Sequence, residues 1–503
     1  MKRKLKILVA ASEVAPFVKE GGLADVTGAL SAALSVKGHD VRLVLPRYHQ
    51  IDPKKYKLTK RKETLSVPMG VIGTVEASIM EGKLPGTSVP SRRAGEPVIV
   101  YFIENEYFFG RPGGLYSTID GDGYMDNDNR FTFFSRATIE LCRELKFSPD
   151  CIHVNDWHTA ALPIFLNTAY RGDPIVGNCA TLLTIHNMQH QGEFYEGLMD
   201  VLGIGWEHFN YLGLERDGKT NLLKGGIYHS TLVNTVSESY AREIQTPEFG
   251  MNLDGVLRER AADLCGILNG VDYENWSPED DPLIASTYSL DKLANKALCK
   301  ADMQRTFGLP EREDVPVIGI VSRLVKQKGI DILAEAICGL LELDIQIVLL
   351  GAGEVWAHFF YGDMPNRYKG KFGCYIGYDN TLAHKIEAGA DFFLMPSRFE
   401  PCGLNQMYSM RYGTIPIVRA TGGLNDTVEN LNEAENTGTG FKFYDITAEA
   451  LSNTVGWAIY TYYNRKDLME GLIQRAMKKR FTWADAAEKY EALYIRAIEK
   501  RLG

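Results

Sequence analysis

Cationic side chains gather directly after one of the apolar runs in the second half of the sequence. The segment Val321-Ser-Arg-Leu-Val-Lys-Gln-Lys-Gly329 supplies Arg323, Lys326 and Lys328. Fixed cations of this kind stabilise the negative charge that develops on a leaving diphosphate. The segment therefore predicts a phosphate-binding loop, and its alternative interpretation is a basic surface loop.

A second segment with phosphate-binding character follows the first apolar run of the chain. Lys19-Glu-Gly-Gly-Leu-Ala-Asp-Val26 combines a cation with two glycines at the expected start of a helix, where anions bind. The segment lacks the G-x-G-x-x-G spacing of dinucleotide-binding proteins, which argues against a dehydrogenase. A plain strand-to-helix turn with a solvated Lys19 is the alternative.

Polar residues also follow two other apolar runs. His153-Val-Asn-Asp-Trp-His158 and Thr184-Ile-His-Asn187 lie at the ends of predicted strands where ligands bind in parallel α/β sheets. The histidines at 153, 158 and 186 are a residue type that binds metals, but their spacing does not resemble a zinc motif on a helix. We therefore expect these side chains to hydrogen-bond a substrate.

Three further segments contain turn residues. Pro396-Ser-Arg-Phe-Glu-Pro-Cys-Gly-Leu404 and Thr421-Gly-Gly-Leu-Asn-Asp426 each follow an apolar run, and Gly266-Ile-Leu-Asn-Gly-Val-Asp272 ends the first half. The Asn-Gly turn by itself requires no function. Cys402 has no adjacent histidine, so we expect a packed thiol rather than a nucleophile.

Two acidic pairs, Asp120-Gly-Asp122 and Asp126-Asn-Asp128, offer carboxylates for a divalent cation. The register of an EF-hand fails because Tyr124 occupies the third ligand position. We therefore favour a structural acidic loop.

These segments need rigid elements to position them, and the sequence supplies two series of strand-length apolar runs. Runs without polar alternation suit strands buried on both faces, and helix-forming stretches such as residues 25–36 and 130–145 lie between them. This alternation predicts parallel sheets wrapped by helices. The first series comprises residues 6–11, 41–45, 97–103, 151–154, 181–185 and 231–236, and the second includes residues 317–321, 345–350, 391–395 and 415–418.

An acidic, proline-bearing stretch, Ser277-Pro-Glu-Asp-Asp-Pro282, separates the two series. We therefore predict an α/β protein with two doubly wound domains, residues 1–275 and 283–480. A C-terminal segment, residues 481–503, contains a final helix at 483–500. Ligands of such paired domains tend to bind in the cleft between them.

The composition excludes several classes of protein. With 503 residues, 45% hydrophobic residues and a net charge of −9, the chain is neither disordered nor a typical nucleic-acid binder. Its eight cysteines form no CxxC pair, which predicts reduced thiols. No apolar run is long enough for a membrane span, and the basic start, residues 1–6, precedes too short an apolar run for a signal peptide.

Seven of these segments resemble, in order, the motifs of the bacterial glycogen synthase and plant starch synthase family. The resemblance covers nearly the whole chain. The motifs are Lys19-Glu-Gly-Gly-Leu23, Asn155-Asp-Trp-His158, Thr184-Ile-His-Asn187, Gly266-Ile-Leu-Asn-Gly-Val-Asp272, Ser322-Arg-Leu324 with Gln327-Lys-Gly329, Arg398-Phe-Glu-Pro-Cys-Gly-Leu404 and Thr421-Gly-Gly-Leu424.

The resemblance implies a GT-B fold, in which two Rossmann-like domains face a deep cleft and a C-terminal helix returns to the first domain. It implies retaining transfer of glucose from ADP-glucose to the non-reducing end 4-hydroxyl of an α-1,4-glucan, which elongates glycogen or starch. It implies no metal and no pyridoxal phosphate, and neither nucleic acid nor a membrane is an expected partner.

The resemblance also assigns residues to roles. Arg323 and Lys328 stabilise the departing diphosphate, and Glu400, Asp156 and His186 hold the sugar or support its oxocarbenium-like transition state. The donor-binding residues are Lys19, Gly21, Gly22, Asn269, Cys402, Thr421, Gly422 and Gly423, and the sugar or acceptor side has Asp25, Asn187, Trp157 and His158. We expect the acceptor hydroxyl to attack on the face that the phosphate leaves, whereas a double displacement would use Glu400 as nucleophile.

Three positions depart from family patterns. Tyr408 stands where relatives with a Glu-x7-Glu motif carry a second glutamate after Glu400, which favours the bacterial and plastid branch and ADP-glucose over UDP-glucose. Glu20 replaces a common threonine, and its carboxylate would repel a phosphate unless it points outward. Phe109 stands where some members have tyrosine.

Other functions are weighed against this one. A non-catalytic glucan-binding protein would be expected to have lost Arg323, Lys328 or Glu400, and all three are present. An α-glucan phosphorylase would carry pyridoxal phosphate, and the chain is short for that family. The lack of a presequence before the first strand favours a bacterial cytoplasmic protein.

Overall fold

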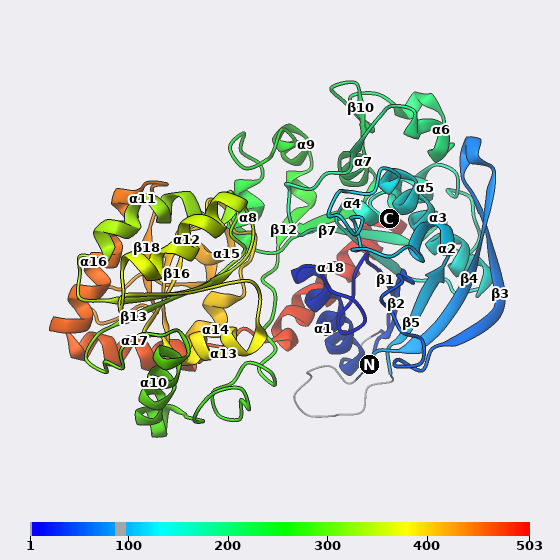
Figure 1. The fold of residues 1–503 in the computed structure, drawn as a ribbon. Helices are drawn as coiled ribbons and strands as arrows, with labels where there is room; N and C mark the ends of the chain where they lie inside the picture. The colour runs from blue at the N-terminus through cyan, green and yellow to red at the C-terminus, as the bar shows by residue number, and fades with distance from the viewer. Residues whose placement is uncertain (1–2, 86–96) are drawn as a thin grey trace. The chain divides into compact units, whose positions relative to one another are not determined.

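The computed structural model describes residues 3–85 and 97–503 and divides into two compact units (Figure 1). Unit 1 comprises Met1–Val236, Ala241–Gly270 and Trp483–Gly503, and unit 2 comprises Ser237–Tyr240 and Val271–Thr482. The chain passes into unit 2 directly after Gly270. The next residue, Val271, donates its amide to the carbonyl of Phe481 at 2.8 Å, and Phe481 also belongs to unit 2. The first two residues of the basic N-terminal segment lie outside the described residues.

Unit 1 is built around a nine-stranded sheet in the order β12-β11-β7-β6-β1-β2-β5-β4-β3. The strands from β12 to β5 are all parallel to their neighbours, which confirms the apolar runs of the first series as buried strands. The bounds are β1 Lys6–Ala10, β2 Asp40–Pro46, β3 Thr59–Pro68, β4 Thr74–Lys83, β5 Ile99–Glu104, β6 Cys151–Asn155, β7 Ala180–Ile185, β11 Leu232–Thr235 and β12 Leu264–Gly266.

One edge of this sheet differs from the prediction. Strands β3 and β4 form an antiparallel hairpin, and β4 pairs antiparallel with β5. The sequence does not announce these strands as apolar runs because β3 is largely exposed and places buried residues only at alternate positions near its end. A small three-stranded sheet, β8 Glu193–Phe194, β10 Lys219–Asn221 and β9 Glu215–Arg216, was also not predicted.

Helices cover the sheet of unit 1. The predicted helices at 25–36 and 130–145 are α1 and α3, and the predicted C-terminal helix is α18. The bounds are α1 Gly22–Val36, α2 Glu106–Phe109, α3 Asn127–Glu144, α4 Asp156–Thr159, α5 Ala161–Asn167, α6 Leu198–Leu202, α7 Leu222–His229, α9 Asp254–Glu259 and α18 Trp483–Leu502. Helix α8, Glu238–Glu243, begins in the part of the chain that belongs to unit 2 and ends in unit 1.

The final helix, α18, returns to unit 1, as the resemblance implied. It packs against α1 and β7 (red beside blue in Figure 1). Buried polar contacts fix it there: the Tyr494 hydroxyl lies 2.8 Å from His153 Nδ1, and the Tyr490 hydroxyl accepts a hydrogen bond from Asn234 Nδ2 at 3.1 Å.

Unit 2 contains a six-stranded sheet in the order β15-β14-β13-β16-β17-β18, with every pair parallel. The strands are β13 Val317–Val321, β14 Gln346–Gly351, β15 Phe372–Ile376, β16 Phe392–Met395, β17 Ile415–Arg419 and β18 Phe441–Phe443. Its helices are α10 Lys296–Thr306, α11 Ile330–Leu340, α12 Val355–Arg367, α13 Asn380–Gly389, α14 Asn405–Arg411, α15 Gly422–Thr427, α16 Ala448–Asn464 and α17 Lys466–Lys478. Figure 1 shows α11 and α12 on one side of the strands and α10, α13 and α14 on the other.

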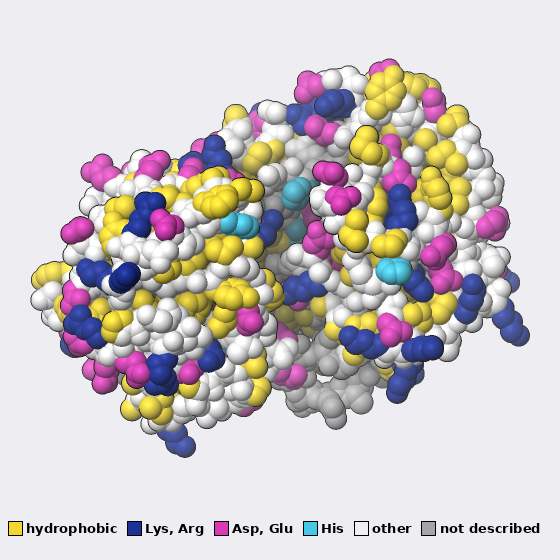
Figure 2. Space-filling view, viewed as in Figure 1, with side chains coloured by type: hydrophobic (Ala, Val, Ile, Leu, Met, Phe, Trp, Pro, Cys, Tyr) yellow, Lys and Arg dark blue, Asp and Glu magenta, His cyan; other side chains and the backbone are white. Residues whose placement is uncertain are grey.

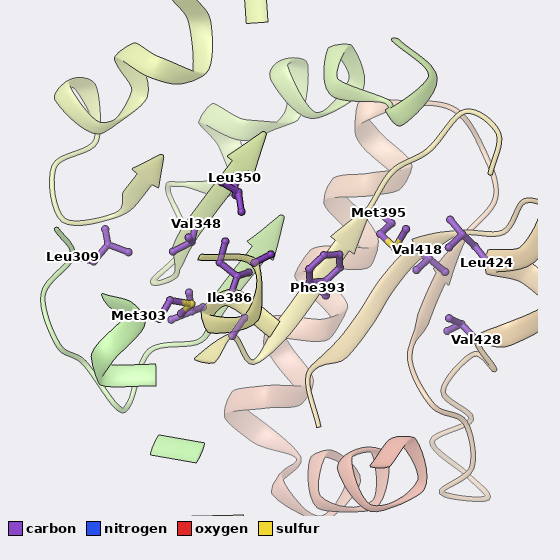
Figure 3. Packing of buried hydrophobic residues seen from close by; sticks show 13 residues of the cluster. Met303, Leu309, Val348, Leu350, Ile386, Phe393, Met395, Val418, Leu424 and Val428 are labelled. Atoms are coloured by element: carbon purple, nitrogen blue, oxygen red, sulfur yellow. The ribbon is translucent and has the colours of Figure 1, made fainter. Parts of the chain in front are cut away.

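An apolar core runs through unit 2. Figure 3 shows one row of buried side chains that crosses the sheet from Leu309 and Val348, past Ile386 and Phe393, to Val428. This core holds β13 and β16 next to each other, and the loops that follow these two strands carry the predicted cations and Glu400.

The parallel parts of both sheets share one strand order. In each unit the chain starts at a central strand, β1 or β13, forms the strands on one side of it, and then returns to the other side through β6 or β16. Ligands of doubly wound sheets bind at the carboxyl ends of the strands where the order reverses. We therefore expect ligand-binding residues in the loops after β1 and β6 in unit 1 and after β13 and β16 in unit 2.

Other predictions are tested by the same structure. All eight cysteines lie in the described part of the chain, and no two of them form a disulfide there. No described helix is long and apolar enough to cross a membrane. On the face drawn in Figure 2, basic and acidic side chains are interspersed.

Candidate active site

The loop after β13 presents the predicted cations of unit 2. Lys328 lies in a short 3₁₀ turn, Lys326–Lys328, and its Nζ atom forms an ion pair with Glu400 Oε2 at 2.5 Å. Gly329 follows with a φ of +70°, and a Cβ atom there would lie 1.9 Å from the Pro396 carbonyl oxygen. A glycine at this position therefore lets the two loops approach closely enough for the ion pair.

Glu400 is almost fully buried at the end of the loop after β16. Its Oε2 atom also accepts a hydrogen bond from Ser397 Oγ at 3.1 Å. A buried carboxylate needs such partners, because an unpaired charge is costly to remove from water. Lys328 thus balances the charge of Glu400, and its ammonium group has further donors for a ligand.

Arg323 is exposed at the carboxyl end of β13. One guanidinium nitrogen lies 3.3 Å from Gln327 Oε1, and Gln327 Nε2 in turn lies 3.4 Å from the Phe399 carbonyl. The structure therefore brings Arg323, Lys328 and Glu400 to one edge of the sheet of unit 2.

The glycine segment at 421–424 packs against the Glu400 loop. Gly422 has a φ of +44°, and a Cβ atom there would lie 2.1 Å from the Glu400 carbonyl oxygen. The Gly423 amide donates to that carbonyl at 3.0 Å, so it is engaged within the chain and not directed at a phosphate. Thr421 and Cys402 are buried beside this contact, and Cys402 is a packed thiol, as expected.

In unit 1, Asp156 stands at the carboxyl end of β6. Its backbone has a φ of +53°, and its buried Oδ1 atom accepts a hydrogen bond from the His186 amide at 2.7 Å. Burial raises the pKa of Asp156 to about 7, whereas the His186 and Asn187 amides act in the opposite direction. The motifs after β6 and β7 therefore meet at this carboxyl group.

His186 lies beside Asp156 and is neutral. Its Nε2 atom is 2.9 Å from Asn155 Oδ1, and the Asn155 amide group donates to the Ala10 carbonyl. Burial lowers the pKa of His186 to about 3. The imidazole can therefore exchange hydrogen bonds with a sugar but is not a cation near neutral pH.

The other two histidines behave differently from each other. His158 packs between the rings of Trp157 and Tyr116, with centroids 4.1 and 4.6 Å away, and its buried Nδ1 atom has no hydrogen-bond partner among the described residues. His153 is buried between Thr184 Oγ1 and Tyr494. The expectation that His153 contacts a substrate is therefore wrong, because its Nδ1 atom binds Tyr494 of α18 and its Nε2 atom binds Thr184 of β7.

The loop at 19–22 differs from a simple phosphate cradle. Lys19 is exposed and pairs with Asp25 at 2.7 Å, and the Glu20 side chain points to solvent. The Gly21 amide donates to the buried Glu13 carboxylate at 2.9 Å. This amide is therefore not available to a phosphate, contrary to the prediction for Gly21. Gly22 is exposed at the first position of α1.

Asn269 completes the unit 1 residues predicted for the donor. It is buried, and its Oδ1 atom has no hydrogen-bond partner in the described part of the chain. A buried amide oxygen without a partner is uncommon in folded proteins. This orphaned acceptor is a position for a ligand hydroxyl.

The sequence analysis missed two residues that contact these segments. Glu13 follows β1 and lies under the loop at 19–22, and the Tyr116 hydroxyl lies 2.8 Å from Ser12 Oγ and 3.4 Å from Glu13 Oε1. The sequence contains one signal for these residues: Glu13 is a charged residue in an apolar stretch, three residues after a central strand.

The acidic pairs at 120–128 lie in the segment that follows Tyr116, and the Asn127 side chain donates to the Tyr116 carbonyl at 2.9 Å. Arg111 forms an ion pair with Asp126 at 3.0 Å, and Asp120 and Asp122 are exposed in a turn. Within residues 3–85 and 97–503, no group of three or more His, Cys, Asp or Glu side chains has the arrangement of a metal site.

Comparisons with known proteins agree across the chain. Residues 6–259 match the family model "Starch synthase catalytic domain", and residues 304–476 match "Glycosyl transferases group 1". "Glycogen synthase 1" of Geobacter metallireducens is 62% identical over 501 residues, which cover 100% of this chain and 98% of the relative. "Glycogen synthase" of Moorella thermoacetica is 45% identical, with the same coverage of both chains.

A solved structure gives the same answer. The catalytic domain of starch synthase IV from Arabidopsis thaliana, bound to ADP and acarbose, has a TM-score of 0.88 and 30% identity, and the match covers 99% of this chain and 100% of that one. The two Rossmann-like units are thus those of a GT-B fold. From these matches and the motif residues that line both sheet edges, the chain belongs to the starch synthase and glycogen synthase family of glycosyltransferases.

Proposed function

We propose that this enzyme transfers glucose from ADP-glucose to the non-reducing end 4-hydroxyl of an α-1,4-glucan, with retention at the anomeric carbon. The observation that carries the proposal is the Lys328–Glu400 ion pair next to Arg323, at the strand ends where the sheet order of unit 2 reverses. In this proposal the cation binds the diphosphate of the nucleotide sugar and the carboxylate binds its glucosyl group, because ligands of such sheets bind at these strand ends.

In this proposal the cations stabilise the leaving group. The bond between C1 and the phosphate oxygen breaks, and the negative charge on ADP is stabilised by Arg323 and Lys328. Preorganised charge of this kind is usually the largest electrostatic contribution to catalysis. These side chains supply the charge that a divalent cation provides in other transferases, so we propose that no metal and no cofactor is required.

The contacts of Glu400 favour attack on the face that the phosphate leaves. Its Oε2 atom is engaged by Lys328 and Ser397, which lowers its suitability as a nucleophile. The acceptor 4-hydroxyl then forms the new C1–O4 bond, and its proton passes to an oxygen of the departing phosphate. Detection of a covalent glucosyl adduct on Glu400 by mass spectrometry would refute this route.

Unit 1 binds the sugar hydroxyls in this proposal. Asp156 and the Nδ1 atom of the neutral His186 offer hydrogen-bond acceptors at adjacent strand ends, since the Nε2–H group of His186 donates to Asn155. The orphaned Asn269 oxygen accepts a hydrogen bond from a further hydroxyl. His158, Trp157 and Asn187 belong to the glucan acceptor side. We propose a bacterial cytoplasmic location.

The donor assignment rests on the resemblance to ADP-glucose enzymes and on a relative that binds ADP. Incorporation of labelled glucose into glycogen should be measured from ADP-glucose and UDP-glucose in parallel, with EDTA and without added metal. Incorporation from ADP-glucose alone supports the proposal. A preference for UDP-glucose refutes the donor, and restoration of activity only by a divalent cation refutes the metal-independent mechanism.

A non-catalytic glucan-binding protein is the second candidate function. It would show glycogen binding by co-sedimentation but no incorporation from either donor under any metal condition. The presence of Arg323, Lys328 and Glu400 in one cluster argues for the enzyme.

A further inference from the structure

Glu13 is a buried carboxylate that no motif identified. It lies three residues after β1, at the reversal point of the unit 1 sheet, and its side chain is almost fully buried. Burial of a carboxylate is unfavourable unless hydrogen bonds compensate it. The question is therefore what Glu13 holds.

Its first partner is the loop that carries Lys19. Glu13 Oε2 accepts hydrogen bonds from the Glu20 amide at 2.5 Å and from the Gly21 amide at 2.9 Å. Gly21 also lies close to Glu13, since a Cβ atom at Gly21 would approach Glu13 Oε1 to 3.4 Å. One carboxylate thus fixes two successive peptide groups between Lys19 and α1.

The backbone of Glu13 is fixed from the same direction. The Thr27 hydroxyl, from within α1, lies 3.0 Å from the Glu13 carbonyl, and the Ala15 amide donates to the Ala24 carbonyl. The loop and the first turns of α1 are therefore tied to one residue at the end of β1.

The second partner is Tyr116, from the glycine-rich loop before α3. Its hydroxyl lies 3.4 Å from Glu13 Oε1 and 2.8 Å from Ser12 Oγ, and its ring packs on His158. Glu13 consequently contacts both the loop of Lys19 and Tyr116, whose ring packs on His158.

We propose that Glu13 is a positioning residue that fixes the loop at 19–22 and Tyr116 in one arrangement for glucosyl transfer. This inference rests on the proposed function. Glu13 does not contact substrate: it acts through Lys19 on the donor side and through Tyr116 on the sugar side. Its loss frees both segments at once, and misplacement of groups by about 1 Å costs up to about 100-fold in rate.

The test compares three variants with the unmodified chain in the ADP-glucose incorporation assay. Glu13→Ala removes the acceptor atoms, whereas Glu13→Gln retains one oxygen that can accept both amides. Glu140→Ala is the matched control, because Glu140 is also a buried carboxylate of unit 1 and binds Tyr170 and Arg143 at 2.6 and 2.7 Å, away from the loop.

We expect Glu13→Ala to raise the KM for ADP-glucose and to lower kcat, with a combined loss in kcat/KM of about 100-fold. Glu13→Gln should recover most of the KM for ADP-glucose, and Glu140→Ala should keep both constants within about threefold. Thermal unfolding of each variant separates these effects from stability. Should Glu13→Ala fail to fold, the same constants for Glu13→Gln and Tyr116→Phe, and for the double variant, give the coupling between the two side chains.

Equal losses for Glu13→Ala and Glu140→Ala, in proportion to their losses of thermal stability, would overturn the proposal, because any buried carboxylate would then serve. Additive effects of Glu13→Gln and Tyr116→Phe would overturn the link between the two segments. Incorporation by the unmodified chain tests the proposed function, and the ratio between variants tests Glu13, so the two fail separately.

Discussion

At the scale of single residues, two of the cations assigned to the donor form ion pairs within the chain. Lys328 pairs with Glu400 in unit 2, and Lys19 pairs with Asp25 in unit 1. A bound diphosphate therefore adds to an existing charge balance and does not meet isolated cations. The carboxylates limit how far the cations move and so contribute to their preorganisation.

Lys328→Ala tests this view in unit 2. We expect kcat with ADP-glucose to fall about 100-fold or more, because a cation at the leaving group is lost and Glu400 is left buried without its partner. Lys326→Ala, at an exposed lysine in the same turn, is the control and should keep most of the activity. Similar kcat values for the two variants would contradict the role of Lys328.

Asp156 gives a pH-dependent prediction. Its pKa is raised from 3.8 to about 7 by burial, so the folded protein binds a proton at Asp156 that the unfolded chain releases between these values. This contribution to the free energy of unfolding is present below about pH 4 and is lost as the pH rises through about 7, by up to about 4 kcal/mol. The free energies of unfolding of the unmodified chain and of Asp156→Asn should be measured by denaturant unfolding over this range. The value for the unmodified chain minus the value for the variant should decrease as the pH rises. A difference that is constant with pH would show that Asp156 is ionised throughout.

At the scale of elements, the strand ends determine where the functional side chains lie, and the glycines determine how closely the loops pack. Four loops matter, those after β1, β6, β13 and β16, and each follows a central strand of its sheet. Gly329 and Gly422 permit backbone contacts with the loop of Glu400 that no other residue type would allow.

Gly422→Ala tests the packing of α15 on the Glu400 loop. The new Cβ atom would meet the Glu400 carbonyl oxygen at 2.1 Å in a left-handed backbone conformation, so we expect Glu400 to shift and kcat to fall at least about tenfold. Gly456→Ala, inside α16 with nothing within 4 Å, is the matched control and should stabilise the fold by about 0.5–1 kcal/mol. Unchanged kcat for Gly422→Ala would mean that this contact does not position Glu400.

Tyr494→Phe tests how α18 is held on unit 1. The change leaves the buried Nδ1 atom of His153 without its partner, so we expect a loss of about 1–3 kcal/mol in the free energy of unfolding. Tyr195→Phe removes the same group from an exposed tyrosine of unit 1 and should be neutral. Equal stabilities of the two variants would show that the hydroxyl of Tyr494 contributes nothing to the docking of α18.

At the scale of the whole molecule, the same strand order occurs twice, and each copy places functional residues at its reversal point. The glycine fingerprint of dinucleotide-binding proteins is absent even though the strand order is the same. Fold and ligand are therefore separate properties, and the loops decide the chemistry.

Hydrogen exchange with bound ADP tests whether the loops at the reversal points of both sheets bind the nucleotide. We expect ADP to slow amide exchange in peptides that contain residues 322–329 and 419–427 of unit 2 and residues 19–26 of unit 1, with or without Mg²⁺. The acidic loop at 120–128 should not change, because its Asp126 is already paired with Arg111. Mg²⁺-dependent protection confined to 120–128 would return that loop to consideration as the nucleotide site.

The apolar runs of the sequence predict most of the parallel strands and the positions at which these strands end. Parallel strands that are buried on both faces appear in the sequence as continuous apolar runs. The polar residues that follow such strands in the chain lie together at the carboxyl ends of the strands. This local logic located Asp156, His186, Lys328 and Glu400. It failed for β3 and β4, where the strand is exposed and the pattern is weak.

Only the tertiary structure decided which hydrogen bonds those residues make. The Gly21 amide binds Glu13, the Gly423 amide binds the Glu400 carbonyl, and His153 holds Tyr494 of α18. Tyr408, the departure from the Glu-x7-Glu pattern, stacks on Trp276 with ring centroids 4.2 Å apart. Each partner depends on segments that meet only after folding. Sequence spacing gives the location of a donor or acceptor, but a buried polar group binds whatever the packed chain brings within about 3 Å.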